Sequence, residues 1–284
     1  MNPLNARCAD LSRAAGERLL ATATTAWSWL LIEVPGTWPR DVSSGGVLPA
    51  DAAEAVSSWL ERTPRSRALF LRRPGRAASQ KLAFVVRAEE SAAETRKLEL
   101  ASHELLATVD FDADGELVET QLVLVCGHGT RDACCALRGT AAYAALATRL
   151  GEEQLWISSH HGGHRFAANV LVLPHGIHLG RVEPGNAPAV TARALAGQIE
   201  LEHYRGRTFY DPAVQAAEHA VRESTGLDRI GDLRLAGTEG SIVRFRSSDG
   251  DEHAAVVEET VGRPVPASCG AEPEAQRTFG ARLV

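Results

Sequence analysis

Cysteine and histidine are concentrated in two short stretches of this 284-residue chain. Residues 126–135 read CGHGTRDACC, and residues 158–167 read SSHHGGHRFA. These twenty positions hold three of the five cysteines and four of the ten histidines. Thiolates and neutral imidazoles are ligands of zinc and of iron–sulfur clusters, and a thiolate can also act as a nucleophile. The two stretches therefore predict a metal or redox site.

The residues around these side chains indicate how they are positioned. Cys126 ends an apolar strand, and Cys135 directly precedes an alanine-rich helix, whose N-terminus would stabilise a thiolate. Gly127 would let the backbone approach a bulky group closely. His160 and His164 are four residues apart, but the Gly-Gly pair between them disfavours a helix. We expect them on a loop that wraps around a bound group.

Three chemistries fit two thiolates and two imidazoles. One is a [2Fe–2S] cluster held by Cys126, Cys135, His160 and His164, and another is a structural zinc site with the same ligands. The third is a thiol redox or nucleophilic site with a histidine as base. Packed cysteines and surface histidines would be the non-functional interpretation. Eight residues separate the two cysteines, more than the usual ~2–4 of zinc sites, but this spacing does not decide between zinc and iron. Physical reasoning also leaves open whether Cys134 or Cys135 is the ligand.

The elements that carry these residues predict an α/β fold, because strands alternate with helices. The first unit reads as strand, helix, strand, strand, over residues 27–35, 51–63, 68–74 and 81–89, with further strand material in KLELASHELLATVDF. The second unit has the order of a thioredoxin-like fold: a strand at 119–126, a helix at 136–151, a strand at 154–158, a hairpin at 168–182 and a helix at 187–203. A helix at 211–223 and a β-rich tail follow.

We therefore expect three parts: an N-terminal α/β unit (1–117), a thioredoxin-like domain (118–225) and a β-rich extension (226–284). LLIEVPGTWPRD and LVLVCGHGTRD both run from a strand into a loop that ends in Arg-Asp. This similarity suggests that the first unit is a degenerate thioredoxin-like repeat without ligands.

The composition of the chain limits the classes of binding partner and the cellular compartment that we expect for this protein. A net charge of −6 and a pI near 5.9 argue against binding to nucleic acid or to anionic membranes. The longest apolar stretch, WSWLLIEV, is too short to span a bilayer, and the first residues do not resemble a secretory signal. Five unevenly spaced cysteines are not typical of a secreted disulfide framework, so we expect a cytoplasmic protein.

The pattern C-x-H-G-x-R-D-x-C-C, followed by HHGGHRFA-x-x-x-x-x-L-P-x-G, resembles the sucrase/ferredoxin-like family. The similarity covers roughly residues 8–225, including AGERLLATA, WLLIEVPGTWPRD and YRGRTFYDPAVQAAEHAVR, with a looser match at PASCG. The resemblance implies a thioredoxin-like [2Fe–2S] ferredoxin with two cysteine and two histidine ligands. The ligands would be Cys126, Cys135, His160 and His164, with Cys134 not required.

One-electron transfer is the role that such a cluster implies, in place of hydrolysis, since no carboxylate pair for glycoside hydrolysis is evident. We assign no catalytic residues. Histidine ligands would couple the electron to a proton, so the reduction potential should fall as pH rises. A flavin or nicotinamide motif is not evident, so we expect a separate reductase or redox protein as partner. The sequence leaves open whether the chain forms a homodimer.

Other residues of the two stretches are expected to support the site. His128 would hydrogen-bond near the cluster, Arg131 would tie its loop down by pairing with Asp132, and Arg165 would offset charge or face a partner. Cys8 and Cys269 are expected to be bystanders.

Overall fold

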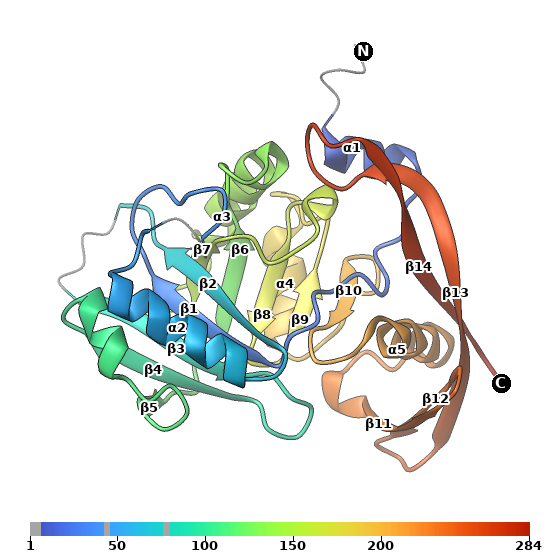
Figure 1. Cartoon of the computed structure of the whole chain (residues 1–284). Helices are drawn as coiled ribbons and strands as arrows, with labels where there is room; N and C mark the ends of the chain where they lie inside the picture. Colours follow the sequence, from blue (N-terminus) through green and yellow to red (C-terminus); the bar gives the residue numbers. More distant parts are fainter. Residues whose placement is uncertain (1–6, 43–45, 76–79) are drawn as a thin grey trace.

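The computed structural model describes residues 7–42, 46–75 and 80–284. A mixed sheet of ten strands forms the body of the molecule, and a second sheet of four strands lies beside it (Figure 1). In the large sheet the strands follow the order β10-β9-β8-β6-β7-β2-β1-β3-β4-β5. The α/β fold class predicted from the sequence is confirmed.

The first half of the chain supplies five neighbouring strands at one side of this sheet. β1 and β2 are parallel, because helix α2 connects them, whereas β3 and β4 follow as antiparallel strands. The bounds are α1 Cys8–Ala14, β1 Ser28–Glu33, α2 Ala50–Arg62, β2 Ser66–Arg72, β3 Lys81–Arg87, β4 Glu94–Leu100, the 3₁₀ helix η2 His103–Thr108 and β5 Glu116–Leu117.

The second half repeats this arrangement. β6 and β7 are parallel strands joined by a helical crossover, and β8 and β9 follow as antiparallel strands. The order β7-β6-β8-β9 thus matches β2-β1-β3-β4, and the halves join where β2 pairs antiparallel with β7. The bounds are β6 Leu122–Cys126, the π-helix η3 Cys135–Gly139, α3 Thr140–Leu146, β7 Leu155–Ser158, the 3₁₀ helix η4 His164–Phe166, β8 Val170–Leu173, β9 Ile177–Leu179, α4 Ala187–Leu195 and β10 Tyr204–Arg207.

The two halves share one apolar core on one face of the sheet. Alternate residues of β1 point to opposite faces, with Trp29 and Leu31 in this shared core. Phe84 of β3 contacts Trp156 of β7, with ring centroids 5.8 Å apart. Two strands separate β3 from β7, about 14 Å in a flat sheet, so the sheet must curl around this core.

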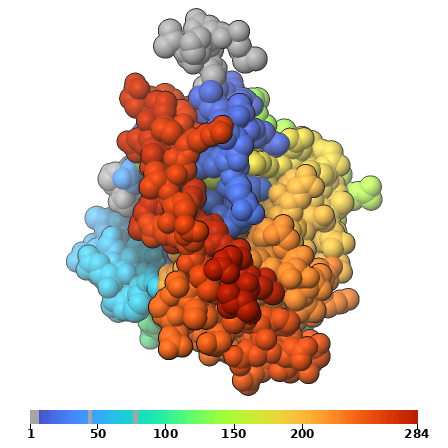
Figure 2. Space-filling view, turned by 90° about the vertical axis from the view of Figure 1, so that its right-hand side faces the viewer, coloured from blue at the N-terminus to red at the C-terminus, as the bar shows by residue number. Residues whose placement is uncertain are grey.

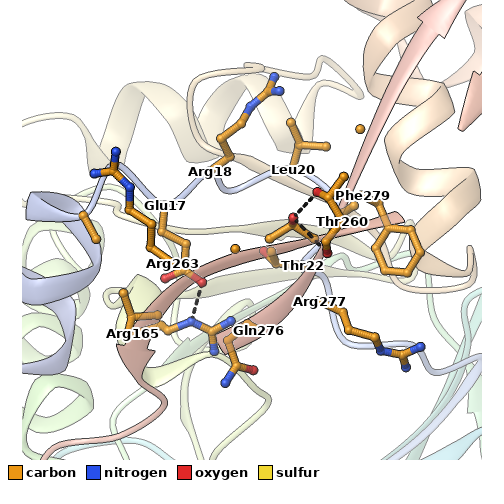
Figure 3. A pocket seen from close by; sticks show the side chains of 17 residues that line it. Glu17, Arg18, Leu20, Thr22, Arg165, Thr260, Arg263, Gln276, Arg277 and Phe279 are labelled. Atoms are coloured by element: carbon orange, nitrogen blue, oxygen red, sulfur yellow. Dashed lines mark hydrogen bonds and ion pairs between the residues drawn. The ribbon is translucent and has the colours of Figure 1, made fainter. Parts of the chain in front are cut away.

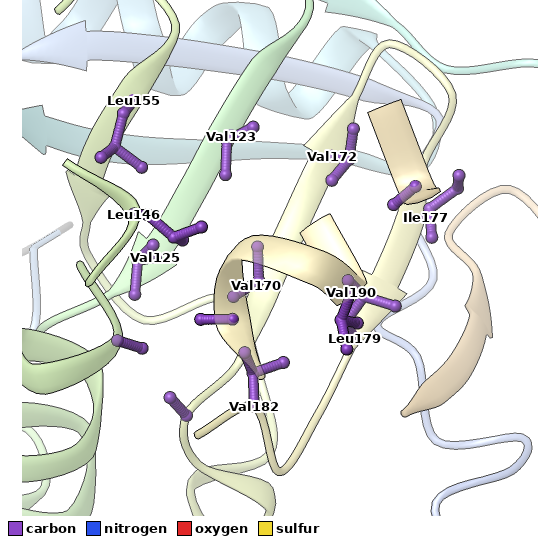
Figure 4. Packing of buried hydrophobic residues seen from close by; sticks show 14 of the residues in the cluster. Val123, Val125, Leu146, Leu155, Val170, Val172, Ile177, Leu179, Val182 and Val190 are labelled. Carbon is purple, nitrogen blue, oxygen red and sulfur yellow. The ribbon is translucent and has the colours of Figure 1, made fainter. Parts of the chain in front are cut away.

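On the opposite face, the helices of the second half cover its strands. Val123 and Val125 of β6 pack with Leu146 of α3 and Val190 of α4 in a buried cluster (Figure 4). β6 is buried on both faces, which is why its sequence LVLVC is a continuous apolar run. This packing fixes the position of the strand that ends at Cys126.

The C-terminal part packs as a separate layer beside the large sheet. Helix α5 (Pro212–Thr225) lies against the four-stranded sheet, whose last two strands form a long hairpin (Figure 1). That hairpin runs beside the N-terminal segment (Figure 2). The bounds are the 3₁₀ helix η5 Ile230–Asp232, β11 Leu233–Glu239, β12 Ile242–Ser247, β13 Glu252–Pro266 and β14 Pro273–Leu283.

Several predicted elements differ in extent from those observed. The helix expected at 136–151 begins as a π-helix and its α-helical part ends at Leu146, while the helix expected at 187–203 ends at Leu195. The strand material expected after residue 97 is divided between β4 and the 3₁₀ helix η2. The three expected parts stay a prediction, although the end of α5 at Thr225 falls on one of their boundaries.

Candidate metal centre

The two stretches rich in cysteine and histidine start from one edge of the large sheet. β6 and β7 are parallel neighbours, and Cys126 of β6 pairs with Ser158 of β7. The Gly127 N–H continues the ladder by donating to the Ser158 carbonyl over 3.1 Å. Because the carboxyl ends of both strands lie together, the loops that follow them face the same region, where open α/β sheets commonly bind ligands.

The four predicted ligands come together at this edge. Cys126 Sγ lies 3.8 Å from His160 Nδ1, and Cys135 Sγ lies 3.4 Å from His164 Nδ1. The two imidazole rings stack with centroids 3.6 Å apart and an angle of 16° between their planes.

These donors do not all converge on a single point. The donor atoms of Cys126, Cys135 and His160 lie within 4.8 Å of one another, whereas His164 groups at that distance with Cys135 and Asp132. The described residues therefore offer a short row of donors in place of one tetrahedral cage. Such Cys/His groupings are compatible with metal binding.

The protonation states suit metal ligation. Burial, followed by the effect of His164, lowers the pKa of His160 far below its ordinary value. Burial also lowers the pKa of His164 to about 4, although Asp132 opposes this shift. Both rings are therefore neutral at neutral pH, as ligands must be. The Cys135 thiol lowers the pKa of Cys126, while the same contact, with burial, raises the pKa of Cys135.

The glycines of these loops have a different role from the one expected. A Cβ at position 127 would lie 2.5 Å from the Ile157 side chain, so Gly127 allows close packing with β7 and makes no room for a bound group. Gly163 has φ +78°, and a Cβ there would lie 2.5 Å from Nη2 of Arg205. The histidine loop therefore wraps around an arginine side chain.

Arg205 is the residue of this site that sequence reasoning missed. Its buried guanidinium donates to the Gly162 carbonyl over 3.0 Å and to Asn169 Oδ1 over 2.9 Å. Asn169 Nδ2 in turn donates to the Gly163 carbonyl over 2.8 Å. These bonds fix the backbone between the two histidines. A strand arginine in the YRGR motif was the only sequence signal for this role.

His128 lies beside His160 and contacts its backbone. Its Nδ1 accepts the His160 N–H over 3.3 Å, which assigns the ring proton to Nε2, and Nε2 donates to the Pro39 carbonyl over 2.8 Å. His128 therefore ties the histidine loop to the loop before α2. It acts on the position of His160 through the backbone.

The expected pairing of Arg131 with Asp132 is not among the ion pairs of the described residues. The Asp132 carboxylate instead accepts backbone N–H groups from Cys134 and Cys269, each over 2.7 Å. Two short bonds to main-chain donors hold this carboxylate in a buried position. The Arg131 charge acts at the centre, where it adds to the effect of burial in lowering the pKa of His164, against the opposing effect of Asp132.

Arg165 faces the N-terminal segment. Its Nε donates to Glu17 Oε1 over 2.7 Å, and both side chains are largely buried. The pair lies on the wall of a cavity of about 530 Å³ between the N-terminal segment and the β13–β14 hairpin (Figure 3). Arg18, Arg263 and Arg277 also line this cavity. Glu17 therefore neutralises the charge that was expected to serve the centre or a partner.

The fold and this site define a mixed α/β protein with clustered cysteine and histidine donors compatible with a metal ion. The chain belongs to the sucrase/ferredoxin-like family, whose model matches residues 19–206. That region contains both ligand stretches and most of the large sheet.

Curated relatives carry the name altered inheritance of mitochondria protein 32. The protein from Eremothecium gossypii is 30% identical over 146 residues, 46% of each chain. Those from Meyerozyma guilliermondii and Saccharomyces kudriavzevii are 30% identical over 99 residues and 32% identical over 105 residues, covering 31% and 32% of this chain and 35% and 34% of theirs. The chain thus spans between about a third and a half of these relatives. A comparison with solved structures gives no match.

None of the helices in the described ranges is both long and apolar enough to cross a bilayer.

Proposed function

We propose that this protein transfers electrons through a [2Fe–2S] cluster held by Cys126, Cys135, His160 and His164. The observation that carries the proposal is the arrangement of the four donors. Two thiols lie together, two imidazoles stack beside them, and the four do not close on a single point. Family membership supports this choice over a structural zinc site with the same ligands.

The donor set fits such a group chemically. A bound cluster would supply a one-electron redox couple, and histidine in place of cysteine raises its potential. The two thiols provide soft anionic ligands, and the buried imidazoles are neutral at physiological pH. Burial of Cys126 and Cys135 keeps water away from the sulfur ligands, whereas His160 is partly exposed.

The histidines orient one ring nitrogen inward. Nδ1 of His160 faces Cys126, and Nδ1 of His164 faces Cys135. With Nδ1 as the ligand atom, the Nε2–H of each ring stays free to release a proton. Oxidation lowers the pKa of a ligating imidazole, so the reduction potential is expected to fall as pH rises above that pKa.

Electron transfer would require a partner. The matched region corresponds to the two halves of the large sheet, and a flavin or nicotinamide motif is not evident in the sequence. We therefore propose that a separate reductase or redox protein delivers the electron, with the partly exposed His160 nearest to it. NAD(P)H oxidation by the purified chain alone would contradict this part of the proposal.

The test is the visible absorption and EPR spectrum of anaerobically purified protein, with iron and sulfide counted per chain. We expect about two irons and a reduced EPR signal that shifts in His160→Cys and in His164→Cys. Cys134→Ser is the matched control, because this neighbouring thiol groups with Cys8 and Cys269 and is not one of the four proposed ligands. A colourless wild type whose zinc is lost in Cys126→Ser would assign the centre to a structural zinc ion.

A further inference from the structure

Three cysteines from distant parts of the chain meet at one point. Cys8 lies in α1, Cys134 precedes η3, and Cys269 lies in the turn between β13 and β14. The Sγ atoms of Cys134 and Cys269 are 3.4 Å apart, and Cys8 Sγ is 3.6 Å from each. Cys8 and Cys134 are fully buried and Cys269 is partly buried. Cys8 and Cys269 were expected to be bystanders, and the structure gives them a shared location.

Asp132 adds a carboxylate to this group. Its Oδ1 lies 3.5 Å from Cys269 Sγ and 3.8 Å from Cys8 Sγ, and the side chain is only 4% exposed. Within the described ranges, lysine, arginine and histidine form no ion pair with this carboxylate. The backbone N–H groups of Cys134 and Cys269 hydrogen-bond to this carboxylate but carry no charge, and a buried negative charge favours a nearby cation. The four side chains therefore have the charge and the position to hold one.

We propose that Cys8, Cys134, Cys269 and Asp132 bind a zinc ion at a second site, distinct from the centre at Cys126. Tetrahedral zinc with Zn–S of about 2.3 Å and Zn–O of about 2.0 Å places sulfurs about 3.8 Å apart and sulfur and oxygen about 3.5 Å apart. The observed separations of 3.4–3.8 Å are close to this geometry. Binding would release the thiol protons to solvent.

The spacing favours one ion over the other groups that cysteines hold. In an iron–sulfur cluster the three thiolates would be divided between at least two irons, which would place some of the sulfurs further apart. A disulfide would leave the third thiol and the carboxylate buried without a partner, and its sulfurs would lie about 2.05 Å apart. All three sulfurs are instead nearly equidistant.

A zinc ion here would join three segments that are far apart in the sequence. The N-terminal segment and the β13–β14 hairpin run side by side (Figure 2), and residues of both line the cavity of about 530 Å³ (Figure 3). The third segment is the loop that carries Cys135. The second site would therefore fix both outer segments on the candidate metal centre, and it stands on its own residues whether or not that centre holds iron.

The test is the zinc content of the full chain, measured by elemental mass spectrometry after anaerobic purification with zinc available. We expect about one zinc per chain in the wild type and in Cys126→Ser. The zinc content should fall at least tenfold in Cys8→Ser and Cys269→Ser, and Cys269→His should restore it, because imidazole is also a zinc ligand. Iron lost only in Cys126→Ser would separate the two sites.

A second measurement does not depend on how those variants fold. Co²⁺ added to metal-free Cys126→Ser protein should give thiolate-to-cobalt charge-transfer absorption, and equimolar Zn²⁺ should abolish it. Wild-type protein without zinc, or with a Cys134–Cys269 disulfide, would overturn the proposal. Zinc that is lost in Cys126→Ser but kept in Cys269→Ser would also overturn it. If the protein lacks iron but the zinc contents of the wild type and the variants are as expected, only the electron-transfer proposal is contradicted.

Discussion

Cys134 and Cys135 are adjacent in sequence and face different sets of donors. Cys135 Sγ lies 3.4 Å from His164 Nδ1, whereas Cys134 Sγ lies 3.4 Å from Cys269 Sγ. The start of η3 turns one thiol toward the histidine loop and the other toward the outer segments. The two cysteines can therefore be tested separately although their backbones are continuous.

The first prediction concerns this pair. Cys135→Ser should abolish iron binding, because a serine hydroxyl does not replace a thiolate ligand, while Cys134→Ser should retain most of the iron. Iron and sulfide analysis of the two variants, purified side by side, measures the difference. Equal loss in both variants would contradict separate roles.

A second prediction concerns Gly139 of η3. A Cβ at this position would overlap the carbonyl oxygen of Cys126 at the end of β6. Gly139→Ala should therefore push η3 away from the sheet, lower the free energy of unfolding by about 1–3 kcal/mol and weaken iron retention. Gly151→Ala is the control, since no atom lies within 4 Å of its Cβ position, and it should stay within about 0.5 kcal/mol of wild type. Urea unfolding of the two variants and of the wild type measures these differences in the free energy of unfolding.

Arg205 supports a third prediction. Arg205→Met keeps much of the side-chain volume but leaves the Gly162 carbonyl and Asn169 Oδ1 without their donor. We expect a loss of about 3 kcal/mol in unfolding free energy and a more mobile histidine loop. Arg193→Met removes a 42%-exposed arginine with surface ion pairs and should cost less than about 1 kcal/mol. Similar losses in the two variants would argue against a positioning role for Arg205.

The fourth prediction is a pH dependence from His178, which is buried in β9. Burial, followed by the charge of Arg205, holds its pKa well below the ordinary value. At acidic pH the His178 imidazole therefore binds a proton in the unfolded chain but not in the folded chain. The free energy of unfolding keeps its full value above about pH 6.5 and falls as the pH decreases below it. His178→Gln should reduce the slope of unfolding free energy between pH 6.5 and 5 by up to about 1.4 kcal/mol per pH unit. An unchanged slope would show that His178 does not carry this effect.

Local sequence patterns predicted much of the fold. The apolar run before Cys126 and the hairpin around Pro174 form strands because uniformly buried strands require continuous apolar sequence. The helix expected over 136–151 was less well predicted. Its start is a π-helix, and Ala147 ends its α-helical part, although alanine-rich sequence favours a longer helix. Close packing of Gly139 against β6 favours the π-helical geometry at the start of this helix. This packing is a tertiary contact, which the local sequence does not predict.

The site could be predicted in part for a similar reason. The four proposed ligands lie at the end of β6 and in the segments that directly follow the adjacent strands β6 and β7, so local patterns and spacing bring them together. The second group of cysteines joins Cys8 to Cys269, which are 261 residues apart. Such a contact depends on the position of the turn between β13 and β14 in the folded protein, so a local sequence pattern does not predict it.

The contact between Phe84 and Trp156 has a consequence for modularity. Each half of the large sheet has the strand order of a small independent domain, yet among the described residues the inner faces of the two halves share one buried cluster. We therefore expect that residues 118–284 produced without the first half would expose an apolar surface and aggregate. The half without ligands would then be required to cover the apolar face of the half with ligands. Neither half could be lost in evolution without loss of the other.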